Sequence, residues 1–239
     1  MTRLSVNINK IATIRNARGG NEPDVEKAAV NIEHYGAEGI TVHPRPDERH
    51  IRYSDVRAIK PLITTELNIE GNPIAKFRDL VCEVVPDQVT LVPDAVNALT
   101  SNAGWDTIAN KAFLTDVVAL FKSKGIRTSI FIDPDPKMAD GAAECGADRV
   151  ELYTATYAAS YASGREEAIA PYLETAREAR EAGLGLNAGH DLNLVNLEYF
   201  IRTIPWTDEV SIGHALICDA LYLGLEKTVK AYLSKVKIF

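Results

Sequence analysis

Three observations predict an α/β protein in which eight parallel strands close into a barrel surrounded by helices, the (β/α)8 or TIM barrel fold. Short and nearly continuous apolar segments alternate eight times with segments of helical periodicity. The sequence lacks the Gly-x-Gly-x-x-Gly motif that is typical of an open sheet binding a dinucleotide. Its 239 residues suit a single barrel domain over 1–239, although two small domains would also fit this length.

The individual elements follow from these apolar patterns. Strand candidates rich in Val, Ile and Leu lie at about 4–9, 39–43, 67–71, 88–93, 128–133, 149–154, 185–188 and 209–214. Between them, apolar residues recur at helical spacing, as in 25–32 and 113–121. Four glycines end helical segments shortly before a strand, where a left-handed backbone is favoured: Gly36, Gly125, Gly146 and Gly183. The stretch 94–111 is long for a strand-to-helix connection and predicts a lid.

Charge and composition exclude several classes of partner. The net charge of -7 and pI of about 5.3 argue against nucleic-acid or anionic-membrane binding, so any phosphate site must be local. No apolar run approaches the roughly 20 residues that span a bilayer. The three cysteines lack C-x-x-C spacing, and no apolar signal segment opens the chain. We therefore expect a reduced, cytoplasmic protein.

Polar residues gather where the predicted strands end, which is the catalytic face of such a barrel. Four of the five histidines follow strands and only His34 lies within a helix, which indicates a shared site. For Asp133 and Glu151 a purely structural role in the barrel mouth stays open, as does a solvated position for His50. Tyr153, Tyr157 and Tyr161 are interpreted as packing residues. The strand-end residues are Asn7, Asn9, Lys10, Arg15, Arg18, His43, Arg45, Glu70, Asp133, Glu151, Asn187, His190 and His214.

The segment 211–216, Ser-Ile-Gly-His-Ala-Leu, joins the last strand to a helical tail. Gly213 permits close backbone approach, and the free amides of the following helix would bind a phosphate. The segment therefore predicts a phosphorylated substrate, with a plain turn as the alternative. A metal site is not expected, because metal-binding histidine spacing is missing and Lys10, Arg18 and Arg45 would repel a cation.

Seven stretches in order resemble the pyridoxine 5′-phosphate synthase family across essentially the whole chain. They are NINKIATIRNARGG, GITVHPRPDERHI, LNIEGNP, TLVPD, SIFID, NAGHDLN and SIGHALI. The resemblance implies a barrel with additional helices and assembly as a homo-octamer. It also implies condensation of 3-amino-2-oxopropyl phosphate with 1-deoxy-D-xylulose 5-phosphate to pyridoxine 5′-phosphate, phosphate and water, without metal or organic cofactor.

The resemblance also implies residue roles. His43 and Glu70 would be proton acceptors, and His190 would be the proton donor. The aminoketone phosphate would be held by Asn7, Arg18, Gly213 and His214, with Arg18 able to reach a neighbouring subunit's site, and Asp191 would also bind substrate. The sugar phosphate would be held by Asn9, Lys10, Arg45, His50 and Thr100.

The sequence departs from the family pattern at three positions. Asn9 and Lys10 stand where many members carry Asp-His, and Asp191 stands where others carry Gly. The family roles at these three positions are therefore expectations only. Lys10 would contact phosphate as a point charge, and Asp191 would act through its backbone amide.

Two other functions are compatible with a phosphate-binding barrel. The first is a sugar-phosphate isomerase or aldolase, but an aldolase needs a Schiff-base lysine at a strand end and none of the strands ends in one. The second is a non-catalytic ligand-binding barrel, for which the Asn9-Lys10 exchange is the only support. The presence of His43, Glu70 and His190 argues against it.

Overall fold

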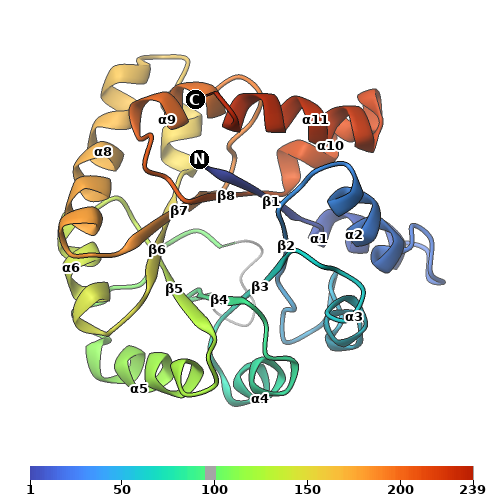
Figure 1. Ribbon diagram of the computed structural model, residues 1–239, viewed down its shortest axis with the longest axis horizontal. Helices are drawn as coiled ribbons and strands as arrows, with labels where there is room; N and C mark the ends of the chain where they lie inside the picture. Colours follow the sequence, from blue (N-terminus) through green and yellow to red (C-terminus); the bar gives the residue numbers. More distant parts are fainter. Residues whose placement is uncertain (95–100, 239) are drawn as a thin grey trace.

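The computed structural model describes residues 1–94 and 101–238. Eight parallel strands form a closed barrel in which each pairs with the next along the chain and β8 pairs with β1 (Figure 1). The strands are β1 (Arg3–Asn7), β2 (Gly39–Val42), β3 (Glu66–Gly71), β4 (Gln88–Leu91), β5 (Arg127–Ile132), β6 (Arg149–Tyr153), β7 (Gly185–Gly189) and β8 (Glu209–Ile212). The closed barrel predicted from the alternating pattern is confirmed.

Helices surround the barrel, and two of them instead of one follow β1, β6 and β8. These second helices are the additional ones that the resemblance implied. Over the described residues the helices are α1 (Asn9–Asn16), α2 (Val25–His34), α3 (Tyr53–Ile59), α4 (Ala75–Val84), α5 (Lys111–Lys122), α6 (Pro136–Glu144), α7 (Ala155–Ser160), α8 (Arg165–Glu181), α9 (Leu197–Thr203), α10 (His214–Leu223) and α11 (Leu225–Val236).

The predicted glycine positions are confirmed by the backbone. Gly36, Gly125, Gly146 and Gly183 have φ of +107°, +74°, +81° and +80°, a region in which side chains with a Cβ are strained. Each glycine lets the chain leave a helix and turn into the next strand.

Three strands, β1, β4 and β8, end two residues earlier than the sequence predicted. β1 stops at Asn7, whose side-chain oxygen accepts a hydrogen bond from the Asn9 amide at 3.0 Å and so turns the chain into α1. Asn9 and Lys10 therefore lie in the first turn of a helix. β8 stops at Ile212, and His214 opens α10.

The strands are less continuously apolar than the sequence suggested, because alternate residues point into the barrel and are polar. Ser5 and Thr41 share a hydrogen bond of 2.7 Å, and Thr90 donates to Asn68 at 3.0 Å. The residues between them, such as Val6, are fully buried on the opposite face of the strands, toward the helices. Hydrogen bonding between neighbouring strands compensates these polar groups for their loss of water.

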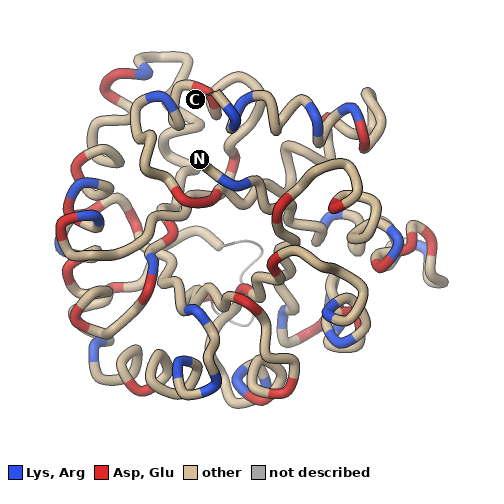
Figure 2. Tube along the Cα trace, viewed as in Figure 1, with Lys and Arg blue, Asp and Glu red and all other residues tan. Residues whose placement is uncertain are grey.

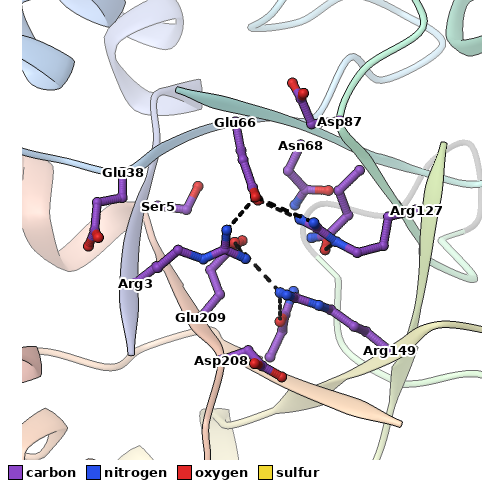
Figure 3. A network of polar contacts seen from close by, with 12 residues as sticks. Arg3, Ser5, Glu38, Glu66, Asn68, Asp87, Arg127, Arg149, Asp208 and Glu209 are labelled. Carbon is purple, nitrogen blue, oxygen red and sulfur yellow. Dashed lines mark hydrogen bonds and ion pairs between the residues drawn. The ribbon is translucent and has the colours of Figure 1, made fainter. Parts of the chain in front are cut away.

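A cluster of charged residues fills the amino-terminal mouth of the barrel (Figure 3). Arg3 and Arg127 both pair with Glu66. Glu209 lies 3.5 Å from Arg3 Nη2 and 3.9 Å from Arg149 Nη1. Burial raises the pKa of Glu209 to about 7, although the charges of Arg149 and Arg3 oppose the shift.

The raised pKa of Glu209 predicts a loss of stability as pH rises. Below about pH 4.5 Glu209 is protonated in both the native and the unfolded state. Between about pH 4.5 and pH 7 it ionises in the unfolded state but stays protonated in the native state, so the free energy of unfolding falls across this window. The fall amounts to at most about 3 kcal/mol. Denaturant unfolding at pH 5 and pH 8 should show a smaller pH dependence for Glu209→Gln than for the native chain. The exposed Glu226→Gln is the control, and equal slopes in all three proteins would contradict the prediction.

The outer surface carries both signs of charge. Figure 2 shows Lys and Arg interspersed with Asp and Glu over the helices around the barrel. Among the described helices, none combines the length and apolar character needed to cross a membrane.

Candidate active site

A cavity of about 550 Å³ lies at the carboxyl-terminal mouth of the barrel. It is formed where the strands deliver the polar residues that the sequence placed at their ends. All the predicted site residues except Arg18 and Thr100 line it: Asn7, Asn9, Lys10, His43, Arg45, His50, Glu70, His190, Asp191, Gly213 and His214.

The two exceptions differ in kind. Arg18 lies in the turn after α1, where it is exposed and outside the lining of this chain's cavity. Thr100 lies outside the described residues.

Several lining residues were not assigned a site role from the sequence. Thr13 lies one helical turn after Asn9, and this spacing on α1 could have revealed it. Tyr153 was interpreted as a packing residue, but it ends β6 and faces the cavity. The full set is Thr13, Arg49, Ser101, Glu151, Tyr153, Leu192, Ser211 and Ala215.

His43 and Glu70 form the centre of the site. His43 Nδ1 lies 3.6 Å from Glu70 Oε2, and both side chains are more than 90% buried. Asn7 Nδ2 donates to the same Glu70 oxygen at 3.4 Å. The ends of β1, β2 and β3 thus bring an amide, an imidazole and a carboxylate together, and such a group can move protons.

Asp94, just beyond β4, contacts the other side of His43. Its Oδ2 lies 3.6 Å from His43 Nε2 and accepts hydrogen bonds from Arg45 Nη2 at 2.8 Å and Ser101 Oγ at 2.7 Å. Asn72 Nδ2 donates to the Asp94 backbone oxygen at 2.8 Å. Asp94 was not among the site residues predicted from the sequence, although its position just after a strand could have revealed it.

Asn9 supports the loop that carries His43. Its side-chain oxygen accepts a hydrogen bond from the His43 backbone amide at 2.9 Å. A carboxylate at this position, which the resemblance led us to expect, could accept the same hydrogen bond. The exchange of Asp for Asn therefore preserves this contact.

His50 is half-buried, so it is not the solvated histidine that the sequence left open. Burial, reinforced by the charges of His43 and Arg45, lowers the pKa of His50 to about 3. Its Nδ1 accepts a hydrogen bond from the Ile51 amide at 2.9 Å. The neutral ring must then carry its proton on Nε2, which can donate to a phosphate oxygen.

His190 and Asp191 follow β7 in a left-handed backbone conformation, with φ of +80° and +58°. Glycine adopts this conformation most easily, and Asp is among the residues that tolerate it. This explains how Asp191 can stand where the resemblance led us to expect Gly. Thr154 Oγ1 donates to the His190 backbone oxygen at 2.6 Å and helps to hold the turn.

The His190 ring packs against aromatic neighbours, with centroid distances of 5.1 Å to Tyr153 and 5.3 Å to Phe131. Burial lowers the pKa of His190, although the charges of Glu70 and Asp191 oppose the shift. The ring is therefore largely neutral near pH 7, and its protonated form is a stronger acid than an ordinary imidazolium.

Glu151 lies deep in the cavity floor, on β6. Burial raises the pKa of its carboxyl well above the usual range, and the charges of Glu70 and Glu209 raise it further. Its Oε2 is buried without a hydrogen-bond partner among the described residues. Burial thus favours the protonated form of Glu151, which lines the cavity.

The amino end of α10 forms another wall. A Cβ at Gly213 would lie 3.1 Å from Asn7 Cβ, which explains why glycine occupies this close approach of β8 to β1. The first-turn amides of α10 have no partners within the helix, and the helix dipole is positive here. This end of α10 is suited to an anion such as phosphate.

The described part of the 94–111 stretch is anchored to β5. The Trp105 amide donates to the Phe131 oxygen at 2.8 Å, and the Gly104 amide donates to Asp133 Oδ2 at 3.1 Å. Asp133 therefore has the structural role that the sequence left open. The remainder of the predicted lid, 95–100, lies outside the described residues.

Together, these groups define the class of protein: a barrel enzyme whose cavity is lined by titratable side chains, by Lys10 and Arg45 and by the amino end of α10. Within residues 1–94 and 101–238, no group of three or more His, Cys, Asp or Glu is arranged to hold a metal ion. The model of a family described as pyridoxal phosphate biosynthesis protein PdxJ matches residues 4–238. The chain belongs to this family.

Full-length relatives agree with the family match. The chain is 64% identical over 237 residues to a pyridoxine 5′-phosphate synthase of Cytophaga hutchinsonii, covering 99% of this chain and 100% of the relative. It is 62% identical over 232 residues to the protein of the same name from Bacteroides thetaiotaomicron, covering 97% and 98%.

Solved structures with low sequence identity share the fold alone. Phosphoribosyl anthranilate isomerase from Thermotoga maritima aligns over 100% of both chains with a TM-score of 0.63 and 13% identity. Tryptophan synthase from M. tuberculosis aligns over 99% of this chain and 93% of its own, with a TM-score of 0.64 and 13% identity.

Proposed function

We propose that the cavity is the active site of a pyridoxine 5′-phosphate synthase in which His43, Glu70 and His190 transfer the protons. The enzyme condenses 3-amino-2-oxopropyl phosphate with 1-deoxy-D-xylulose 5-phosphate and serves vitamin B6 biosynthesis. The observation that carries the residue assignment is the contact of His43 with Glu70 at 3.6 Å inside a cavity that also contains His190. The full-length relatives named for this activity support the same reaction.

The two phosphates would occupy different walls of the cavity. The amino end of α10, with Gly213, His214 and the neighbouring Asn7, suits the phosphate of the aminoketone. Lys10, Arg45 and neutral His50 suit the phosphate of the sugar, because they offer positive charge and a ring N–H donor. This arrangement would bring the reacting carbonyl and amine groups between the phosphates, over Glu70 and Glu151.

Ring formation needs an imine between the two substrates, loss of water and phosphate, and closure of a carbon–carbon bond. Each step moves protons, and a positioned acid or base typically accelerates such a step about 10²–10⁴-fold. His43 and Glu70 would accept protons from the substrate carbons and amine. His190, largely neutral near pH 7, would take up a proton in an earlier step and donate it to a departing oxygen.

The assembly and compartment belong to the same proposal. A homo-octamer is supported by exposed apolar side chains at the end of α10, where Leu221, Tyr222 and Leu223 are 69%, 89% and 47% exposed. Arg18 is exposed beyond α1, which supports the proposal that it reaches the site of a neighbouring subunit. Cys82, Cys145 and Cys218 are free thiols, which fits a cytoplasmic enzyme. Sedimentation analysis of the purified protein tests the oligomer.

The reaction itself is tested by incubating the purified protein with both substrates and measuring pyridoxine 5′-phosphate and phosphate together. We expect equal amounts of both products, and neither when one substrate is omitted. Binding of one substrate without product would overturn the reaction while leaving the phosphate-binding cavity intact.

Lys10 tests the assignment of the sugar-phosphate wall. Lys10→Ala should raise the KM for 1-deoxy-D-xylulose 5-phosphate more than the KM for the aminoketone, because the ammonium acts as a point charge near one phosphate only. Steady-state kinetics with each substrate varied in turn provide the measurement. The exposed Lys227→Ala is the control, and equal increases in both KM values would argue against the assignment.

A further inference from the structure

We propose that Asp94 is a positioning residue that fixes His43 with its proton on Nε2 and leaves Nδ1 as the proton acceptor. This inference rests on the proposed function, since it refines how His43 serves that reaction. Asp94 ends the stretch TLVPD, but the sequence analysis gave it no role.

The His43 imidazole lies between two acidic side chains. His43 has a carboxylate near each ring nitrogen, with Glu70 Oε2 3.6 Å from Nδ1 and Asp94 Oδ2 3.6 Å from Nε2. These distances are slightly longer than hydrogen bonds, as is common for catalytic contacts before substrate binds. A neutral imidazole carries one proton, so one nitrogen must donate and the other must accept.

The two carboxylates differ in how they are held and in which of them lines the cavity. Asp94 is held rigidly, because Arg45 and Ser101 donate to its Oδ2 and Asn72 donates to its backbone oxygen. Its side chain is 5% exposed, and it is absent from the lining of the cavity. Glu70, in contrast, lines the cavity. Asp94 is thus a fixed acceptor behind the ring, and Glu70 lies on the side where substrate would bind.

A buried carboxylate that accepts from one imidazole nitrogen orients the ring and selects its tautomer, and it stabilises the imidazolium after proton uptake. With Nε2–H directed to Asp94, the Nδ1 lone pair lies beside Glu70 at the cavity. The imidazolium formed when Nδ1 takes a proton from substrate would then lie between two carboxylates. Asp94 also orients Arg45, so it couples the base to the sugar-phosphate wall.

The test uses a readout that needs no substrate. Diethyl pyrocarbonate modifies imidazole only when the ring is neutral. Peptide mass spectrometry gives the rate of modification at His43 as a function of pH. Asp94→Asn should move the midpoint of this profile to lower pH by about one unit, because a negative charge facing Nε2 is removed. The other charged or titratable groups facing His43 remain in the variant: Glu70 on β3, Arg45 and His50 after β2, and His190 after β7.

Kinetics supply the second readout. Asp94→Asn should lower kcat by about 10²-fold, the lower end of what a positioned base contributes, and Asp94→Glu should recover much of this loss. Asp133→Asn is the matched control, because Asp133 is another strand-end carboxylate that accepts a structural hydrogen bond. It should leave the His43 midpoint unchanged.

The outcomes separate the two proposals. An unchanged His43 midpoint in Asp94→Asn, or a rise in the KM for the sugar phosphate with kcat intact, would overturn the positioning role. The second result would mean that Asp94 serves only to hold Arg45. If the native protein forms no pyridoxine 5′-phosphate, the proposed function fails, and the shift of the midpoint still decides whether Asp94 controls His43.

Discussion

Glu70→Gln should lower kcat about 10²–10⁴-fold while the barrel stays folded. The amide keeps the shape of the side chain but cannot accept a proton, and it places a neutral group 3.6 Å from His43 Nδ1. Asn7, which donates to Glu70, can still form a hydrogen bond with the amide oxygen. We expect KM values to change much less than kcat, since neither phosphate wall is altered.

The measurement is steady-state formation of pyridoxine 5′-phosphate, with circular dichroism and denaturant unfolding to confirm the fold. Glu83→Gln, at an exposed site on α4, is the matched control and should retain native activity. Native kcat in Glu70→Gln would remove Glu70 from the chemical steps. A loss of activity that accompanied unfolding would instead assign it a structural role.

The second large effect concerns stability, at the buried ion pair of Arg15 and Asp55. Arg15 is 1% exposed, and its Nη1 and Nη2 each lie 2.8 Å from an Asp55 oxygen. Arg15 also donates to the His50 backbone oxygen at 3.1 Å, so the pair holds the loop after β2 against α1. Asp55→Ala should cost about 3–5 kcal/mol of unfolding free energy, because it leaves the guanidinium buried without its partner.

A double-mutant cycle separates the loss of the pair from the burial of an unpaired charge. Arg15→Met with Asp55→Leu should be more stable than either single variant, since no charge then remains buried. Denaturant unfolding at one fixed protein concentration provides the free energies, so that any oligomer contributes equally. Strictly additive effects of the two single substitutions would show that the two side chains do not interact in the native state.

The same pair shows where sequence reasoning reaches its limit. Arg15 and Arg18 both follow the first strand, and the strand-end pattern did not distinguish them, since only the resemblance gave Arg18 a role in the site. In the structure Arg15 is buried against α3, whereas Arg18 is exposed. Arg15 lies in the last turn of α1, and Arg18 lies three residues later, beyond the end of the helix. Only the packing of α1 decides which of the two side chains is buried.

Local patterns in the sequence determined the fold and which residues belong to the site. Alternating apolar segments with glycines at helix ends specify strand, helix and turn through short-range sterics and burial, and parallel strands in a closed barrel bring their carboxyl ends to one mouth. Any polar residue just after a strand must then lie near that mouth. His43, Glu70 and His190 could therefore be grouped from the sequence, although they are far apart along it.

Only the tertiary structure decided the contacts and charge states within that group. Asp94 stands behind His43, and the pKa of Glu151 is raised, because distances of a few ångströms and the exclusion of water set these properties. Such quantities depend on neighbours from several strands at once. The sequence by itself determined which residues meet at the barrel mouth, and the packing around them determined which groups accept, donate or hold a proton.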